Sequence, residues 1–361
     1  MQKPFFVNSN LFLSLLTFVI LSLSVTSCKK DIVAASNNNG STDSTAAPTV
    51  YVAGCVGDTA VYWKNGVISY LSDGNKASIA KSIFISGNDV YAAGNIGDTA
   101  VYWKNGVATY LKNSEGTAGA ISIFVSGSDV YVAGNEKMSS DYTVATLWKN
   151  GTPAYFPNTI YGEGTYTSSW VNSVYVSGND VYMCGYQTDA VAVGVQFVAV
   201  YWKNDVLSTL PYTTNNSYGA DAIYVSGNNV YAAGSGSVAA GNTVPLYWAN
   251  GQPATVKDTT LQSYAVAINI SGSDVYLAGS QVLPGDDVRA TYWKNGVATN
   301  TTIVGYWDIS QGMALAVSGS DVYVSGFEGS PSGYVAAYWK NGTQVILSTN
   351  QSSYGYSIIV E

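Results

Sequence analysis

A four-part repeat constrains the fold of this chain more than any other feature of its sequence. One copy runs from Ala118 to Tyr155 and contains four short runs, AISIFVSG, DVYVAG, TLWKNG and TPAYF, in which apolar residues alternate with others. Alternation with a period of two is typical of half-buried strands, and turns containing glycine separate the runs. The repeat therefore predicts a four-stranded antiparallel meander.

Seven copies of this repeat follow one another along the chain. The second run recurs as Val-Tyr-x-x-Gly, and the third recurs around tryptophans that lie 40 to 54 residues apart, namely Trp63, Trp103, Trp148, Trp202, Trp248, Trp293 and Trp339. A period of this length with four strands per repeat is typical of β-propeller blades. The sequence thus predicts an all-β fold, a seven-bladed β-propeller of four-stranded antiparallel blades.

The two ends of the repeat array predict how the ring closes. The first copy begins at its second run, Val50–Gly54, and the chain finishes with one additional first run, Ser357–Val360. An open ring would leave two unpaired strand edges, which promote association with other chains. We therefore expect the carboxyl-terminal strand to pair with Val50–Gly54 and to complete the first blade.

Composition divides the chain into three segments. Residues 1–27 hold one early lysine, the apolar run Leu11–Leu23 and three small residues, which is the pattern of a secretory signal peptide. Residues 28–48 are rich in Ser, Asn, Thr and Gly and predict a flexible tether. Residues 49–361 contain all the repeats, so we expect a single propeller domain there.

The junction between the first two segments resembles a bacterial lipobox, because Cys28 directly follows Val25-Thr26-Ser27. The tether and the YWKNG and SGxDVYxAG repeats resemble those of repeat lipoproteins of the Bacteroidota, whereas the likeness to kelch and WD-type propellers is one of architecture alone. The resemblance implies that Cys28 carries lipid such as palmitate and anchors an outer-membrane lipoprotein on the periplasmic or the outer side. An uncleaved membrane anchor is the alternative.

Charge and residue usage exclude several classes of function. Without residues 1–27 the chain has 14 basic and 23 acidic residues, a net charge near −9, and an acidic surface repels nucleic acid. The chain has no histidine, which removes the histidine-dependent serine triad and histidine-ligated metals. We expect no cofactor, no metal and no enzymatic activity. The alternative is a two-carboxylate glycosidase that uses a pair among Glu115, Glu136, Asp141, Glu163, Asp189, Asp221, Asp308 and Glu328.

Residues that recur in every blade are interpreted as scaffold. The aspartates of the SGxDVY runs are assigned to tight turns, and the lysines before Asn-Gly are assigned to the flanks of two-residue hairpins. The seven repeat tryptophans are expected to form wedges between blades. Cys55 and Cys184 lie in distant blades, so we expect two buried free thiols rather than a disulfide.

Sequence variation concentrates on one face of the predicted ring. The connections between the second and third strands and between blades differ in length, and variable polar and aromatic residues flank a small residue near the axis of each blade. Such a face usually binds the ligand of a repeat protein. The candidate binding residues are Trp170, Trp307, Tyr264, Tyr354, Tyr218, Lys81, Asp221 and Arg289. The alternatives are that the aromatic residues merely cover the blades and that Arg289 pairs with a neighbouring aspartate.

These observations predict a lipid-anchored binding or scaffolding module of the cell envelope. Its expected partners are the membrane, through Cys28, and a glycan or an envelope protein at the variable face. Nucleic acid is not an expected partner, and we expect a monomer. A glycosidase or a purely structural component of an envelope assembly remains as an alternative.

Overall fold

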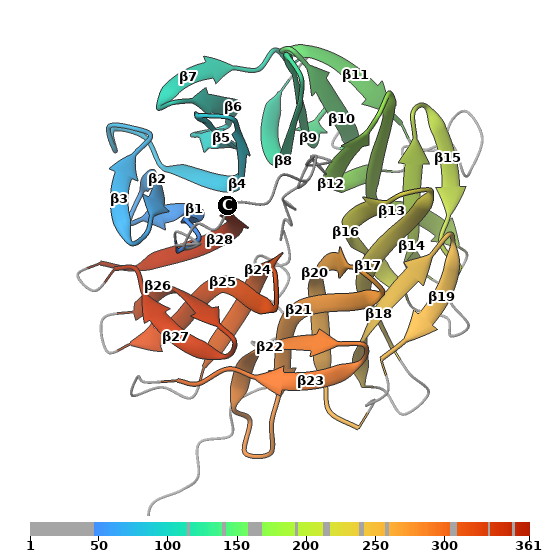
Figure 1. The fold of residues 1–361 in the computed structure, drawn as a ribbon. Helices are drawn as coiled ribbons and strands as arrows, with labels where there is room; N and C mark the ends of the chain where they lie inside the picture. Colours follow the sequence, from blue (N-terminus) through green and yellow to red (C-terminus); the bar gives the residue numbers. More distant parts are fainter. Residues whose placement is uncertain are drawn as a thin grey trace, which may run out of the picture.

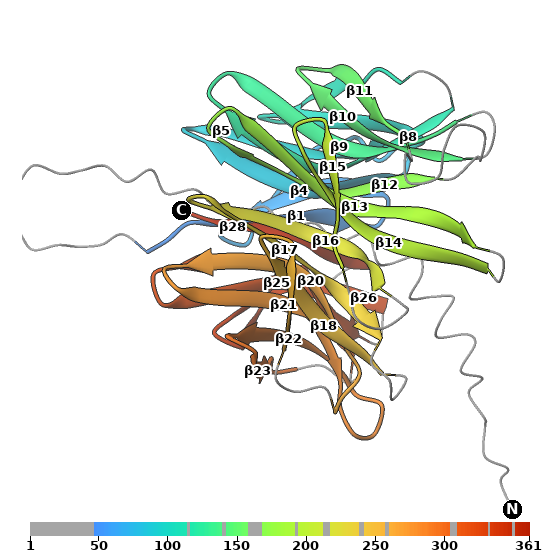
Figure 2. The ribbon, with the colours of Figure 1, turned by 90° about the vertical axis from the view of Figure 1, so that its right-hand side faces the viewer.

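The chain forms a closed ring of seven antiparallel sheets around one axis (Figure 1). The computed structural model describes residues 47–113, 116–138, 142–157, 168–191, 194–211, 217–237, 242–256, 260–303, 309–330, 333–348 and 351–361. These ranges contain 28 strands and no helix, so they also contain no helix that could span a membrane. Figure 2 shows the same ring from the side. The predicted all-β, seven-bladed propeller is confirmed.

Each blade has four strands, and the order within a blade runs from the innermost strand to the outermost. The blades are β28 (Ser353–Val360), β1 (Val50–Val56), β2 (Thr59–Lys64), β3 (Val67–Tyr70); β4 (Ser78–Ser86), β5 (Asp89–Ile96), β6 (Thr99–Lys104), β7 (Val107–Tyr110); β8 (Thr117–Ser126), β9 (Asp129–Lys137), β10 (Thr143–Lys149), β11 (Thr152–Phe156); β12 (Ser169–Ser177), β13 (Asp180–Val191), β14 (Gly194–Lys203), β15 (Val206–Thr209); β16 (Ser217–Ser226), β17 (Asn229–Ser237), β18 (Thr243–Ala249), β19 (Gln252–Thr255); β20 (Ser263–Ser271), β21 (Asp274–Val282), β22 (Val288–Lys294), β23 (Val297–Asn300); and β24 (Ser310–Ser318), β25 (Asp321–Ser330), β26 (Gly333–Lys340), β27 (Thr343–Ile346).

The last strand of the chain closes the ring. β28 pairs antiparallel with β1, with Ile358 opposite Val52 and Ile359 opposite Tyr51. Backbone hydrogen bonds between Thr49 and Glu361, of 2.6 and 3.0 Å, extend this ladder at its end. The carboxyl terminus consequently lies beside the axis, between β1 and β4 (Figure 1). The predicted pairing of the two chain ends is confirmed.

Buried tryptophans join neighbouring blades. All seven repeat tryptophans are buried, and each stands on the third strand of its blade. The indole N–H of Trp148 donates to the carbonyl of Lys112, which follows the outermost strand of the preceding blade, and that of Trp339 donates to Thr302 in the same way over 2.9 Å. The interpretation as wedges between blades therefore agrees with the structure.

The Asn-Gly pairs form hairpin turns in which both residues have positive φ. The asparagines have φ between 48° and 52° and the glycines between 77° and 83°, as two-residue turns of the right twist require. One blade has Asp205 in place of the glycine and retains positive φ only at Asn204. These turns lie next to the start of each second strand; in β5, for example, the amide of Asn105 donates to the carbonyl of Val90.

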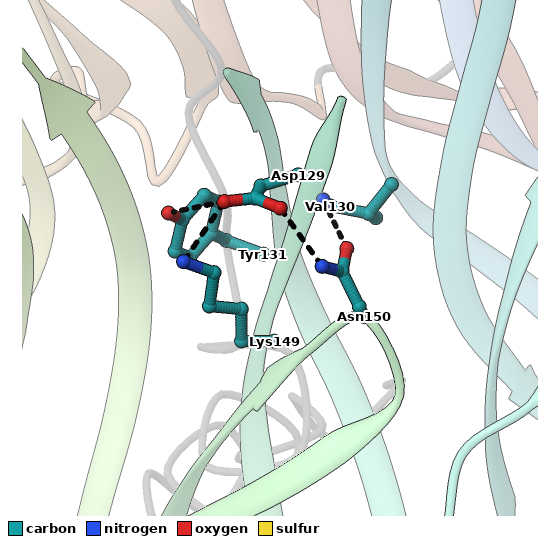
Figure 3. A network of polar contacts seen from close by, with 5 residues as sticks. All are labelled: Asp129, Val130, Tyr131, Lys149 and Asn150. Atoms are coloured by element: carbon teal, nitrogen blue, oxygen red, sulfur yellow. Dashed lines mark hydrogen bonds and ion pairs between the residues drawn. The ribbon is translucent and has the colours of Figure 1, made fainter. Parts of the chain in front are cut away.

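The repeated aspartates do more than the sequence indicated. Asp129 is not a turn residue; it begins β9, and its carboxylate accepts hydrogen bonds from Lys149 at 2.8 Å and from the Asn150 amide at 2.9 Å (Figure 3). The Lys149 ammonium also lies 5.1 Å from the ring centre of Tyr131. The hydrogen bond from Lys149 lowers the pKa of Asp129. Aspartate and lysine are therefore one unit rather than separate turn residues.

The charged pair of this polar network varies between blades. The first blade keeps Lys64 but has Thr49 at the position of the aspartate. Five blades contain the aspartate–lysine pair, formed by Asp89 and Lys104, Asp129 and Lys149, Asp180 and Lys203, Asp274 and Lys294, and Asp321 and Lys340. In one other blade both charges are replaced together, by Asn229 and Ala249, while Asn250 still donates to Asn229 over 2.9 Å. The asparagine of the turn is thus common to the network, and the ion pair is its dispensable part.

Each innermost strand has a β-bulge at the same repeat position. The bulged residues are Lys81, Ile121, Asn172, Asp221, Val266, Met313 and Tyr356. The repeated glycine of the second strand faces this bulge. A Cβ on Gly94 would lie 1.8 Å from the carbonyl oxygen of Ile79, and every other blade has an equivalent contact of at most 2.1 Å. Glycine is required there because a side chain would displace the bulged strand.

We predict that the closing strand contributes as much stability as an internal one. Ile358→Ala should lower the free energy of unfolding by about 2–5 kcal/mol, because Ile358 is fully buried. Ile83→Ala, at the same position of β4, should cost a similar amount, whereas Ile346→Ala in β27, where Ile346 is 37% exposed, should cost less. Urea denaturation measures all three variants. If Ile358→Ala cost no more than Ile346→Ala, the closing strand would not belong to the cooperative core.

We also predict that the turn asparagine matters more than the ion pair beside it. Asn150→Ala removes the acceptor of the Val130 amide at 2.8 Å and places alanine at φ 51°, so it should lower stability by about 1–2 kcal/mol. Lys149→Ala removes an exposed ion pair and should have a smaller effect. Asn150→Gly, which tolerates positive φ, should lie between them. Equal losses for Asn150→Ala and Lys149→Ala in thermal denaturation would contradict this order.

Candidate functional site

The bulged residues form a ring around the propeller axis. Each innermost strand contacts the innermost strands of both neighbouring blades, and β28 contacts β4 to complete the circle. A β-bulge redirects a side chain relative to a regular strand, and in this ring each blade contributes a different residue type. The fold thus sets seven residues of different types around the axis, on the side of the variable connections.

Two of these axial residues are charged and have no counter-ion among the described residues. Lys81 is half-buried and makes no hydrogen bond or ion pair within the described ranges, and burial lowers its pKa to about 8. Asp221 is 8% exposed and receives a hydrogen bond from the Asn172 amide at 3.2 Å; burial raises its pKa to about 8. Both groups are therefore held in surroundings that disfavour their charged forms.

Trp170 stands next to the axial ring and belongs to an aromatic group on one blade. Its ring stacks on Tyr186, with centroids 4.7 Å apart and planes inclined by 19°. Phe197 packs edge-on against Tyr186 at 5.3 Å and is 42% exposed. β12, β13 and β14 supply one residue each, which places all three rings on the face of the variable connections. We call Trp170, Tyr186 and Phe197 the aromatic group.

An open depression of about 320 Å³ begins at the edge of Trp170. Its other lining residues come from the two preceding blades and are mostly small or polar: Asn95, Gly97, Asp98, Thr117, Ala118, Gly119, Asn135, Lys137 and Thr143. The Asn135 side chain is fixed, because it both accepts from and donates to the backbone of Val171, at 2.9 and 3.1 Å. An aromatic edge beside carboxylate, amide and hydroxyl groups is typical of sites that bind polar ligands with apolar faces.

Tyr354 lies in a second aromatic cluster, at the closing strand. Its ring is 4.9 Å from Phe327, 5.7 Å from Tyr334 and stacked at 5.8 Å on Tyr356. Cys55 hydrogen-bonds to Tyr356, and burial raises the pKa of its thiol to about 11. This cluster packs the loop ends of β25, β26 and β28 together.

The remaining predicted site residues are scattered. Tyr264 accepts a hydrogen bond from Gln262 on its hydroxyl. Arg289 forms an ion pair with Asp287 at 2.9 Å, which is the local alternative considered from the sequence. Trp307 and Cys28 lie outside the described residues, as does the side chain of Tyr218. Of the predicted residues whose side chains the structure describes, only Trp170 and Asp221 are connected by contacts, through Asn172 and Tyr186.

The three glycosidase candidates whose side chains the structure describes lie in three different blades. Glu136 is on β9, Asp221 on β16 and Glu328 on β25, and all three are buried. The side chain of Asp189 and the residues Glu115, Asp141, Glu163 and Asp308 lie outside the described part. Among the described residues no group of three or more acidic or cysteine side chains could hold a metal. Cys55 and Cys184 are buried free thiols, as predicted.

Sequence reasoning missed Tyr186 and Phe197. The segment between them was assigned to a variable loop, but it extends β13 and β14 into a long hairpin that is paired up to Val191 and Gly194. The available signal was the residue after the repeated glycine, which is aromatic only in two blades, as Tyr186 and Phe327. Tyr186 contacts both other rings of the aromatic group, and Phe327 contacts Tyr334 and Tyr354 in the second cluster.

Comparison with known proteins finds the fold but no family. No family model matches the chain, and no curated protein matches it. A puromycin hydrolase mutant complexed with PGG has 9% identity and a TM-score of 0.53 over 86% of this chain and 55% of its own. The uncomplexed acylaminoacyl peptidase of Pyrococcus horikoshii has 12% identity and a TM-score of 0.50 over 83% and 50%. The chain spans about half the length of these solved structures.

The prediction that the chain is not an enzyme is contradicted by these comparisons, because the solved structures with this fold are a peptidase and a hydrolase. That prediction was based on the absence of histidine. A missing residue type excludes only the mechanisms that need it, so it does not separate this chain from enzymes built on the same fold. At such low identity the likeness shows the fold, and the propeller fold itself supports a binding or scaffolding module.

Proposed function

We propose that the chain is a glycan-binding module that a lipid on Cys28 anchors at the bacterial cell envelope. One observation carries the choice of a glycan: half-buried Trp170 borders a depression whose other lining groups are amide, carboxylate, hydroxyl and ammonium groups. Sugar rings have apolar CH faces that pack on aromatic planes and hydroxyl groups that need hydrogen-bond partners. The depression offers both at one place.

The rigidity of the site supports this proposal. Trp170 is held by stacking on Tyr186, and Asn135 is held by two backbone hydrogen bonds. A wall fixed before binding loses little conformational entropy when the ligand arrives. The scaffold of paired strands thus presents a preformed surface rather than a mobile one in the described part of the site.

The position of the amino-terminal end supports the anchoring arrangement. The chain enters the ring before β1, where Thr49 pairs with Glu361, on the same face as the Asn-Gly turns. Trp170 lies at the beginning of β12, which is on the opposite face because first strands run antiparallel to second strands. An anchor that precedes residue 47 would therefore be attached on the face opposite the binding face and would not cover it.

Replacement of Trp170 is expected to abolish most of the glycan affinity. Trp170→Ala should weaken binding at least about tenfold, equivalent to ~1.4 kcal/mol, whereas Tyr110→Ala should have no effect because Tyr110 is an exposed ring on the outer strand β7. A glycan array would identify a ligand for the wild type, and calorimetric titration would give the affinities. Equal binding by the two variants, or a wild type that captures an envelope protein and no glycan, would overturn the proposal.

The lipid anchor has a separate test. Cys28→Ser removes the proposed lipidation site, so the protein should move from the membrane fraction to the soluble fraction of the cells, and labelling with an alkyne fatty acid should be lost. Cys55→Ser is the matched control, because Cys55 is a buried free thiol inside the propeller. Membrane association that persists in Cys28→Ser would contradict lipid anchoring and leave the glycan proposal untouched.

A further inference from the structure

Two sets of contacts connect Trp170 with the buried carboxylate of Asp221, one through Tyr186 and one through Asn172. Trp170 stacks on Tyr186, and the Tyr186 ring packs on the backbone of Gly219, where a Cβ would lie only 2.9 Å from it. Asp221 follows on the same strand, β16, and accepts a hydrogen bond from Asn172 of β12, the strand that also holds Trp170. The carboxylate and the aromatic group thus form one site between two neighbouring blades.

No cation from the described part of the chain compensates the carboxylate in this site. Burial alone raises the pKa of Asp221 to about 8. The titratable groups around it are Cys184 and Tyr186, and the pKa of each is raised, mainly by burial and further by Asp221 itself. Both groups are therefore neutral and cannot pair with the carboxylate. The only polar side chain that hydrogen-bonds to it among the described residues is the uncharged amide of Asn172.

We propose that the glycan recognised at this site has a free amino group, and that its ammonium binds between Asp221 and the aromatic group. This inference rests on the proposed glycan-binding function and specifies the sugar class. The ammonium would supply the missing counter-ion, and the faces of Tyr186 and Trp170 attract cations. A neutral sugar would form no ion pair with Asp221, and an acidic sugar would be repelled by its ionised form.

The geometry favours an amine on a sugar over an isolated small cation. The aromatic group extends outward from Asp221 to Phe197 and to the edge of the depression at Trp170. Trp170 borders the depression and also stacks on Tyr186, so a glycan held in the depression can extend over the aromatic group toward the carboxylate. A glycan unit with one amine matches both halves of this surface.

A pair of oligosaccharides that differ only at nitrogen tests the inference. We would compare the hexamer of β-1,4-linked glucosamine with the hexamer of N-acetylglucosamine, using the wild type, Asp221→Asn and Asp58→Asn. Asp58 is an exposed aspartate of the first blade, so its variant has the same net charge as Asp221→Asn. The wild type and Asp58→Asn should prefer the free amine at least about tenfold, and Asp221→Asn should lose this preference.

The pH dependence of the wild type gives a second measurement that does not need a variant. At pH values below the pKa of Asp221, binding of a protonated amine must release the proton of the carboxyl group. The affinity for the glucosamine hexamer should therefore rise about tenfold between roughly pH 5 and pH 6, and binding of the acetylated hexamer should not change. The opposite sign, or equal slopes for both ligands, would refute a role for Asp221.

The outcomes separate this inference from the proposal on which it rests. Equal binding of both hexamers that depends on Trp170 would refute the amine preference and retain a glycan-binding site. Binding of neither hexamer, with no other glycan bound on an array, would refute both. Preference for the amine that is unchanged in Asp221→Asn would show a general attraction of cations to this acidic protein and would overturn the assignment.

Discussion

The contact between a backbone carbonyl and a glycine that has no side chain determines the rest of this propeller. In every blade the innermost strand approaches the repeated glycine of the second strand so closely that a Cβ would overlap the carbonyl oxygen. This approach accompanies the bulge that follows at once along the innermost strand. Seven such contacts set seven variable side chains around the axis while the pairing of the strands stays regular. Within each innermost strand, the bulged residue is thus free to vary, whereas the regularly paired residues maintain the fold.

Charged residues are paired and exposed on one face of the propeller, whereas near the axis they are buried or half-buried and have no charged partner among the described residues. The aspartate–lysine pairs lie at the turn face, are solvent-exposed and mutually compensated, and one blade replaces both charges at once. Solvent screens such pairs, so they contribute little to stability. Asp221 and Lys81 are uncompensated by any described residue near the axis, and their pKa values move toward neutrality. Because a buried unpaired charge destabilises a fold, burial shifts both groups toward their neutral forms.

Repetition decides how far the sequence predicts this structure. Strand order, blade number and ring closure follow from patterns that occur seven times, so one irregular copy such as Asn204-Asp205 did not obscure them. The candidate site depends on features that occur once. Trp170 and Asp221 were found because they stand at variable axial positions, but their connection through Tyr186 depends on a hairpin whose long pairing no repeat could indicate. The aspartates were misassigned to turns because their partners lie about 20 residues away, across a hairpin.

Ring closure distinguishes the blade that contains the aromatic group from the blade that contains the two chain ends. The blade that contains β28 and β1 combines both chain ends, and its loop face is filled by the packed cluster around Tyr354. These packed rings stabilise the closure of the ring. The blade of Trp170 is continuous in sequence, so its rings are not needed to hold the chain ends together, and Phe197 stays exposed. Tyr186 and Phe327, which follow the repeated glycine in their blades, therefore lie in different surroundings: the first in a group with an exposed ring, the second in the cluster at the ring closure.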